Sequence, residues 1–188
     1  MKAMPDFSPR RLRRDETLLL LVDVQERLLP AMFEAERIVR HVSLLARTAR
    51  LLQLPVVVTE QNPSRLGATV APIARVLEEF QPIPKMAFSA CVPETLTALR
   101  DSGRRSVVLC GLETHVCITQ TALDLVENGF TVFLPQDAVS SRYESDKRAG
   151  LERIKGAGVV PASTEMLVYE LLGEAGSGEF KALLPYVK

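Results

Sequence analysis

Four short apolar runs constrain the fold of this chain most strongly, because within them apolar and polar positions do not alternate. They occupy residues 18–22, 55–60, 106–111 and 130–135. Continuous apolar runs of this length are typical of strands buried on both faces of a parallel sheet. Two weaker strands are expected at residues 81–85 and 158–163, so the sequence predicts six strands in all.

The segments between these strands predict helices. Residues 37–52 carry apolar side chains at intervals of three and four, which indicates an amphipathic helix. Further helices are expected at 93–103, 114–127, 145–155 and 163–172. This alternation of strands and helices favours an α/β fold, with helices covering both faces of a parallel sheet.

The length of 188 residues suits one domain, and the 47% apolar content suffices for a full core. We expect an N-terminal arm at residues 1–16, a single domain at 17–173, and a C-terminal loop and tail at 174–188. The tail either packs on a neighbouring copy or folds back on its own domain. The arginine cluster at residues 10–14 is interpreted as part of a solvated arm.

Charge and cysteine content exclude several classes of function. The formal net charge is zero, so no electrostatic signature of nucleic acid or of an anionic membrane is present. No apolar run approaches the roughly 18 residues needed to span a bilayer. The odd number of cysteines, without metal-ligand spacing, favours free thiols and a cytoplasmic location. These cysteines are Cys91, Cys110 and Cys117.

Polar residues at the carboxyl ends of the predicted strands are the first candidates for chemistry, because ligands of open parallel sheets bind there. Three of them are Asp23, Glu60 and Lys85, and the fourth position is the turn at residues 111–117. Cys117 is expected at about the third position of a helix capped by Thr114. Free N–H groups and the helix dipole there favour a nucleophilic thiolate.

Each candidate also has a structural interpretation. Cys117 is alternatively a small buried apolar residue, and Asp23 a helix cap or a member of a structural ion pair. Lys85 follows Pro82 and Pro84 and is alternatively a solvated lysine at the end of an edge strand. Together, however, a carboxylate, an ammonium group and a thiol form a chemically sensible set, in which the carboxylate takes the thiol proton. His115 is two residues from Cys117 and points elsewhere on a helix, so pocket lining or an oligomer contact is favoured for it.

Three stretches, in this order, resemble the isochorismatase-like cysteine hydrolases, a superfamily that includes nicotinamidases and carbamoylsarcosine-type amidohydrolases. They are LLLLVDVQERL with Asp23, PKMAFSA with Lys85, and CGLETHVCITQTALDL with Cys117. The resemblance extends over about residues 17–172. Two further stretches, VVVTEQNPSRLGATVAPI and LPQDAVSSRYESDKRAGLERI, are most similar to the isochorismatase domain-containing hydrolase branch.

The resemblance implies a Rossmann-like three-layer sandwich with six parallel strands in the order 3-2-1-4-5-6. It implies a catalytic triad in which Asp23 is the base, Cys117 the nucleophile, and Lys85 holds both in register. It further implies a cis peptide between Leu112 and Glu113, and an oxyanion hole formed by the backbone N–H groups of Glu113 and Cys117. A homo-oligomer, dimeric or larger, is expected as well.

The chain departs from the better-known relatives in two ways. Nicotinamidases carry histidine metal ligands near the end of the second strand, whereas this chain has no histidine between His41 and His115. We therefore expect no metal and no cofactor. Isochorismatases that cleave a vinyl ether need no cysteine nucleophile, so Cys117 favours acyl chemistry.

The sequence thus predicts a metal-independent cysteine hydrolase that cleaves a small amide or carbamoyl compound through a thioester. The alternatives are a vinyl ether hydrolase, a non-catalytic protein of the same fold, and a redox sensor in which Cys110 resolves Cys117. For substrate binding, the positions nominated from their proximity in sequence to the triad are Gln25, Leu29, Phe88 and His115. Glu60 is expected to contact substrate or to pair with Arg65.

Overall fold

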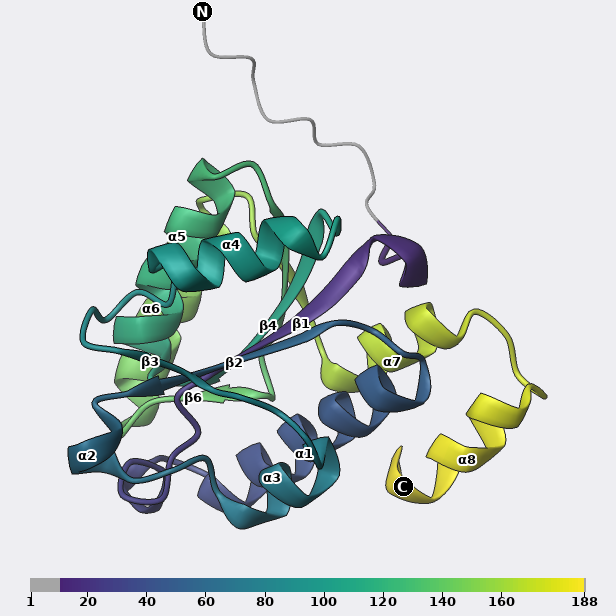
Figure 1. Cartoon of the computed structure of the whole chain (residues 1–188), viewed down its shortest axis with the longest axis horizontal. Helices are drawn as coiled ribbons and strands as arrows, with labels where there is room; N and C mark the ends of the chain where they lie inside the picture. The colour runs from purple at the N-terminus through teal and green to yellow at the C-terminus, as the bar shows by residue number, and fades with distance from the viewer. Residues whose placement is uncertain (1–10, 188) are drawn as a thin grey trace, which may run out of the picture.

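A parallel β-sheet between two layers of helices forms the centre of the computed structural model, which describes residues 11–187 (Figure 1). Every pair of adjacent strands is parallel. The strands are β1 (Thr17–Val22), β2 (Val56–Gln61), β3 (Ile83–Lys85), β4 (Ser106–Leu112), β5 (Thr131–Pro135), β6 (Val139–Ser140) and β7 (Val160–Ala162).

The predicted strand order is confirmed, with one strand more than expected. The main path is β3-β2-β1-β4-β5-β7, in which the six expected strands stand in the order 3-2-1-4-5-6. The additional strand, β6, pairs with Gly111 and Leu112 of β4, beyond the part of β4 that pairs with β5. Its two residues are too few to produce a recognisable apolar pattern.

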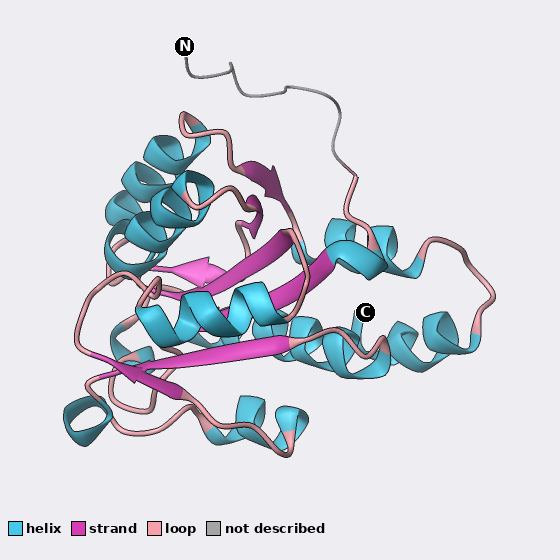
Figure 2. Ribbon diagram, turned by 45° about the horizontal axis from the view of Figure 1, so that its top comes forward, coloured by secondary structure: helices cyan, strands magenta, loops and turns pink. Residues whose placement is uncertain are grey.

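Six longer helices cover the two faces of the sheet (Figures 1 and 2). The apolar side chains of one layer pack in a first core cluster and those of the other layer in a second cluster. The first layer contains α1 (Ala35–Leu51), α3 (Ala71–Leu77) and α7 (Thr164–Leu172), and the second contains α4 (Pro93–Asp101), α5 (Thr119–Glu127) and α6 (Glu144–Lys155). Shorter elements are α2 (Pro63–Leu66), η1 (Arg14–Glu16) and η2 (Leu29–Ala31).

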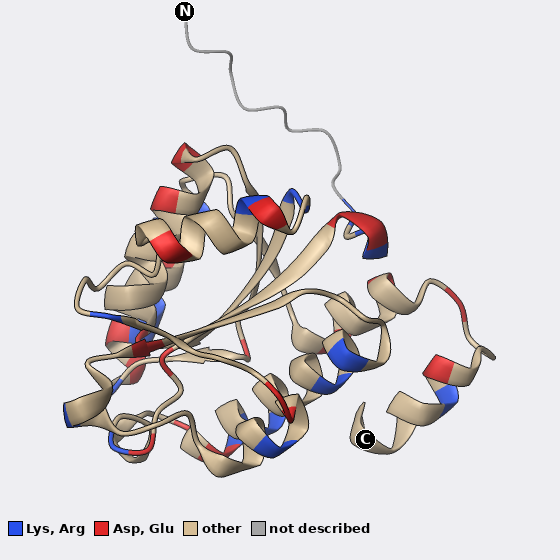
Figure 3. Cartoon of the chain, in the orientation of Figure 1, with Lys and Arg blue, Asp and Glu red and all other residues tan. Residues whose placement is uncertain are grey.

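Strand β1 illustrates why the sequence shows continuous apolar runs. All six of its residues are buried, and Leu19 and Leu21 face the first cluster, whereas Leu18 and Leu20 face the second. Burial on both faces removes the alternation that a half-exposed strand would show. Within residues 11–187, the strands carry charge only near their carboxyl ends, at Glu60 and Lys85, while other charged residues lie on helices and loops (Figure 3).

The segment at residues 174–188, expected to be a loop and tail, contains helix α8 (Gly178–Val187). The Ser177 hydroxyl accepts a hydrogen bond from the Phe180 N–H at 3.0 Å, which supports the start of this helix. Leu183 is buried against α1 and α7, and the guanidinium of Arg47 lies 4.3 Å from the centre of the Tyr186 ring. The segment therefore folds back on its own domain.

The expected arm at residues 1–16 is described only from residue 11 onward, so Arg10 of the arginine cluster lies outside the described residues. Leu12 is buried, and its N–H donates to the Glu170 carboxylate at 2.8 Å. Arg14 donates to the Leu52 carbonyl at 3.1 Å. Leu12 is thus packed on the domain, whereas Arg11, Arg13 and Arg14 are exposed, as expected for a solvated cluster.

Candidate active site

The three residues of the predicted triad come together at the carboxyl ends of the strands. The Lys85 Nζ atom lies 2.6 Å from Asp23 Oδ2, and both side chains are fully buried. The Cys117 thiol lies close enough to the Asp23 carboxylate for each group to influence the pKa of the other, and Cys117 is 4% exposed. A carboxylate, an ammonium group and a thiol therefore share one buried location, although they are far apart in the chain.

Asp23 occupies the position directly after β1 with a positive φ of 57°. Aspartate is among the few non-glycine residues that adopt this left-handed conformation with some frequency. Strand β2 holds it at two points. The Asp23 N–H donates to the Thr59 carbonyl at 3.1 Å, and the Thr59 hydroxyl donates to Asp23 Oδ1 at 2.9 Å.

Lys85 ends β3, the edge strand next to β2. Besides Asp23, its ammonium group donates to Gln61 Oε1 at 2.8 Å and to the carbonyls of Ala87 and Phe88 at 3.2 and 3.1 Å. An ammonium group has three N–H donors, and four acceptors surround this one. The acceptors around Lys85 therefore outnumber its donors, and none is left over for a further partner.

Cys117 belongs to a π-helical turn, η3 (Thr114–Ile118), which leads directly into α5. The residue that precedes this turn is Glu113, so Thr114 is not the cap, and its hydroxyl is buried without a partner. Cys117 is consequently the fourth residue of the turn and not the third. Turns of this kind occur frequently at functional sites.

The end of β4 brings this turn close to β1. Gly111 has a φ of 128°, and a β-carbon there would overlap the carbonyl oxygen of Val22. Glycine thus permits the close approach of β4 to the residue before Asp23. The predicted cis peptide between Leu112 and Glu113 is confirmed. The chain enters η3 directly after Glu113, and the Glu113 backbone lies close enough to the Cys117 sulfur to lower the thiol pKa.

The electrostatics of the site correct one expectation. Burial, followed by the charge of Asp23, raises the pKa of the Cys117 thiol to about 12, although Lys85 opposes this effect. Burial also raises the pKa of the Asp23 carboxyl, against the opposing influence of Lys85. This direction is opposite to the predicted lowering of the thiol pKa, because desolvation by burial is the largest influence on it. Burial therefore favours the neutral form of both groups.

The four residues nominated for substrate binding lie in different surroundings. Gln25 is fully buried, and its amide bonds to the backbone of Gln61 and to the Gly67 carbonyl. Leu29 is partly buried against the first core cluster. Phe88 is 57% exposed, and the ring of His115 hydrogen-bonds to the Ser141 hydroxyl at 2.8 Å.

Glu60 makes neither of the two contacts considered for it from the sequence. Its carboxylate accepts hydrogen bonds from the N–H and the hydroxyl of Thr69, at 2.7 and 2.8 Å. These bonds attach the loop that follows α2 to strand β2. Within residues 11–187, no group of three or more histidine, cysteine, aspartate or glutamate side chains is placed to hold a metal ion.

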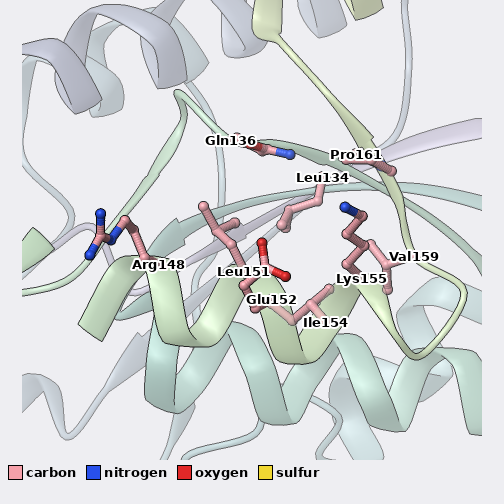
Figure 4. Close-up of a pocket in the computed structure, with 9 residues that line it drawn as sticks. All are labelled: Leu134, Gln136, Arg148, Leu151, Glu152, Ile154, Lys155, Val159 and Pro161. Atoms are coloured by element: carbon pink, nitrogen blue, oxygen red, sulfur yellow. The ribbon is translucent and has the colours of Figure 1, made fainter. Parts of the chain in front are cut away.

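The surroundings of the triad combine exposed apolar side chains and one ion pair. Arg142 lies 2.9 Å from the Glu113 carboxylate, while Met86, Phe88 and Tyr143 are 71%, 57% and 68% exposed. A separate cavity of about 480 Å³ lies between α6 and the strands β5 and β7 (Figure 4), and none of the triad residues lines it. Arg148, Glu152 and Lys155 border that cavity.

Comparisons with known proteins identify the family of the chain. The isochorismatase domain family matches residues 17–166. The chain is 39% identical over 183 residues to the secreted isochorismatase effector Isc1 of Phytophthora sojae, which covers 95% of this chain and 87% of that protein. The chain belongs to the isochorismatase family, and the α/β fold and family together indicate a hydrolase. The resemblance noted in the sequence is thereby confirmed.

Solved structures show the same fold. The structure of MAR1 ribonuclease from Caenorhabditis elegans has a TM-score of 0.89 at 33% identity, covering 95% of this chain and 92% of that one. The YcaC gene product of Escherichia coli, described as an octameric hydrolase of unknown specificity, has a TM-score of 0.89 at 24% identity, covering 95% of this chain and 92% of that one. Each helix among the described residues is too short or too polar to cross a bilayer.

Proposed function

We propose that the chain is an amidohydrolase that cleaves a small amide or carbamoyl compound through a thioester on Cys117. The observation that carries this proposal is the buried contact of Asp23 with both Lys85 and Cys117. Buried charges are costly unless they are paired. A paired carboxylate beside a thiol is suited to accept the thiol proton during nucleophilic attack.

The first step transfers the Cys117 proton to Asp23 as the sulfur forms a bond to the substrate carbonyl carbon. The neutral resting thiol requires this coupling, because the thiolate is scarcely populated at neutral pH when the pKa is about 12. The carbonyl π electrons move to oxygen and give a tetrahedral oxyanion. The N–H groups of Glu113 and Cys117 are the proposed donors to that oxyanion, and such donors contribute roughly 3–4 kcal/mol each to lowering the barrier.

The second step breaks the carbon–nitrogen bond. Asp23 returns its proton to the departing nitrogen, so that ammonia or an amine leaves and a thioester remains. Water then gives a proton to Asp23 and attacks the thioester, and the sulfur leaves with that proton as the acid is released. Lys85 stays charged throughout and limits the cost of the buried carboxylate.

Two rival functions receive less support. Vinyl ether hydrolysis needs no thiol nucleophile, so it does not account for the position of Cys117 beside Asp23. A redox pair with Cys110 is disfavoured because Cys110 packs in the first core cluster and Cys117 in the second, on opposite faces of the sheet. Cys110 is also fully buried, which raises its pKa.

The test is an activity screen of the intact protein and of Cys117→Ala and Cys117→Ser against small primary amides, carbamoyl compounds and a vinyl ether. We expect release of ammonia by the intact protein and its loss in both variants. RNA belongs in the panel because the C. elegans relative is named a ribonuclease. Amide hydrolysis that persists in a folded Cys117→Ala protein would refute the mechanism.

We further propose that the protein is a homo-oligomer, dimeric or larger, and that it is located in the cytoplasm. Exposed Met86, Phe88 and Tyr143 offer apolar surface for contact with another copy, and the E. coli neighbour is described as an octamer. Three free cysteines suit a reducing compartment. Sedimentation velocity and localisation of a tagged chain test these two proposals.

A further inference from the structure

The carboxyl end of β2 presents two polar side chains to the triad. Thr59 and Gln61 are two positions apart in the strand, so they point to the same face, whereas Glu60 points to the other face. The contacts agree with this alternation. Thr59 and Gln61 bond to triad residues, and Glu60 bonds to Thr69 on the opposite side.

Thr59 has no exposed surface and makes its side-chain bond to Asp23 alone. It also lies opposite Val22 in the β1–β2 pairing, so its carbonyl receives the N–H of Asp23. A hydroxyl that donates to Oδ1 while Lys85 holds Oδ2 restricts rotation of the carboxylate about its bond to Cβ. This arrangement defines the direction from which the thiol proton reaches Asp23.

Gln61 holds the ammonium group of Lys85 as Thr59 holds the carboxylate of Asp23. Gln61 lies opposite Lys85 in the β2–β3 pairing. Its Oε1 accepts from the ammonium group at 2.8 Å, and its Nε2 donates to the Met86 carbonyl at 3.0 Å. The Gln61 backbone is itself held by Gln25, whose amide bonds to both its N–H and its carbonyl. The chain of contacts runs from the buried Gln25 through Gln61 to Lys85.

We propose that Thr59 and Gln61 are positioning residues that hold the Asp23–Lys85 pair in its reactive arrangement with Cys117. Neither residue exchanges a proton or forms a covalent bond in the proposed steps, and each acts through its hydrogen bond to Asp23 or to Lys85. Thr59 fixes the carboxylate, and Gln61 fixes the ammonium group together with the loop that follows it. This inference rests on the proposed role of Asp23 as the base, but its test does not require a known substrate.

The decisive variant is Thr59→Val, which removes the hydroxyl and nearly preserves the side-chain shape. Thr59→Ser keeps the hydroxyl and is the conservative rescue. Thr95→Val is the matched control, because Thr95 is equally buried but its hydroxyl has no partner. If Thr59 only supports the fold, its replacement should change thermal stability and leave the titration of Asp23 unchanged.

The primary measurement is the titration midpoint of the Asp23 carboxyl, followed by carbon NMR of labelled aspartate and assigned with Asp23→Asn. Removing a hydrogen bond to the carboxylate favours the protonated form, so Thr59→Val is expected to raise the midpoint by about one to two pH units. Thr59→Ser and Thr95→Val are expected to leave it in place. A midpoint in Thr59→Val equal to that of the intact protein, or an equal rise in Thr95→Val, overturns the inference.

Gln61→Leu is the second variant, and it keeps the proposal testable if Thr59→Val does not fold. Loss of the Oε1 acceptor weakens the hold on Lys85, so the Asp23 midpoint should again rise, whereas Gln120→Leu at an exposed position should not move it. An unmoved midpoint in Gln61→Leu overturns the role of Gln61. With an active amide substrate, kcat should fall about 10- to 100-fold with little change in KM.

The two proposals can fail separately. A shifted midpoint without amide hydrolysis by the intact protein supports the positioning role and refutes the amidohydrolase. Amide hydrolysis with an unmoved midpoint in both variants supports the enzyme and refutes the positioning role. If the midpoint shifts but no amide is hydrolysed, and another activity is later found, the acid limb of its pH–rate profile should shift in Thr59→Val by the same amount as the Asp23 midpoint.

Discussion

Removing the charge of Lys85 should make the stability of the protein depend strongly on pH. In Lys85→Met, the fully buried Asp23 carboxylate loses its counter-ion. A buried charge without a partner is too costly to persist, so Asp23 takes up a proton instead. The folded variant then binds a proton that the unfolded chain releases above the ordinary aspartate pKa of 3.8.

This proton sets the magnitude of the effect. One pH unit corresponds to about 1.36 kcal/mol, and pH 7 lies about three units above the ordinary pKa. Protonating Asp23 therefore costs up to about 4 kcal/mol at pH 7 and about 1.6 kcal/mol at pH 5. Since the folded state binds the extra proton, the free energy of unfolding falls as pH rises. In the intact protein, Lys85 favours the carboxylate form of Asp23, so the folded state loses this proton at a lower pH. The fall in the free energy of unfolding therefore stops at a lower pH than in Lys85→Met.

The assay is urea denaturation of the intact protein, Lys85→Met and the double variant Lys85→Met/Asp23→Asn at pH 5 and pH 7. We expect Lys85→Met to lose more stability at pH 7 than at pH 5. The double variant should show little difference between the two pH values, because it has no carboxylate to protonate. Equal losses in Lys85→Met at both pH values would show that its effect is one of packing and would contradict the reasoning.

Two further predictions concern the thiol and the last helix. Because burial raises the Cys117 pKa from 9.0 to about 12, its alkylation by iodoacetamide at pH 8 should be more than about 100-fold slower than that of a free cysteine. Peptide mass spectrometry measures this rate, and a rate near that of free cysteine contradicts the assigned electrostatics. Leu183→Ala removes the buried side chain of α8 and should lower stability by about 2–3 kcal/mol. Faster proteolysis between residues 173 and 178, with the rest of the domain intact, is the expected result, and unchanged proteolysis argues against the packing of α8.

The strands of the sheet were predictable because burial on both faces produces continuous apolar runs in the sequence. The runs at 18–22 and 106–111 differ from β1 and β4 by one residue at one end. Elements with few residues or mixed polarity were not predictable in the same way. Strand β6 has two residues, α2 has four, and α8 begins at the last glycine of the segment GEAGSG, which favours a loop.

The site was predictable where position along a strand decides the geometry. Asp23 and Lys85 follow or end strands of one parallel sheet, so their side chains meet at one edge. Thr59 and Gln61 were missed, although their spacing of two at the end of a predicted strand was a usable signal. The thiol pKa could not be predicted, because it depends on how completely the folded chain removes Cys117 from water.

The prolines of the two outer strands limit how copies of this protein can meet. Strands β3 and β7 are the outer strands of the sheet, and they contain Pro84 and Pro161. Proline has no N–H to offer to an additional strand. A neighbouring copy therefore has little backbone available for extending the sheet, and an assembly of several chains should grow through side-chain contacts between helices and loops. The same feature protects the outer strands from joining into fibrous aggregates.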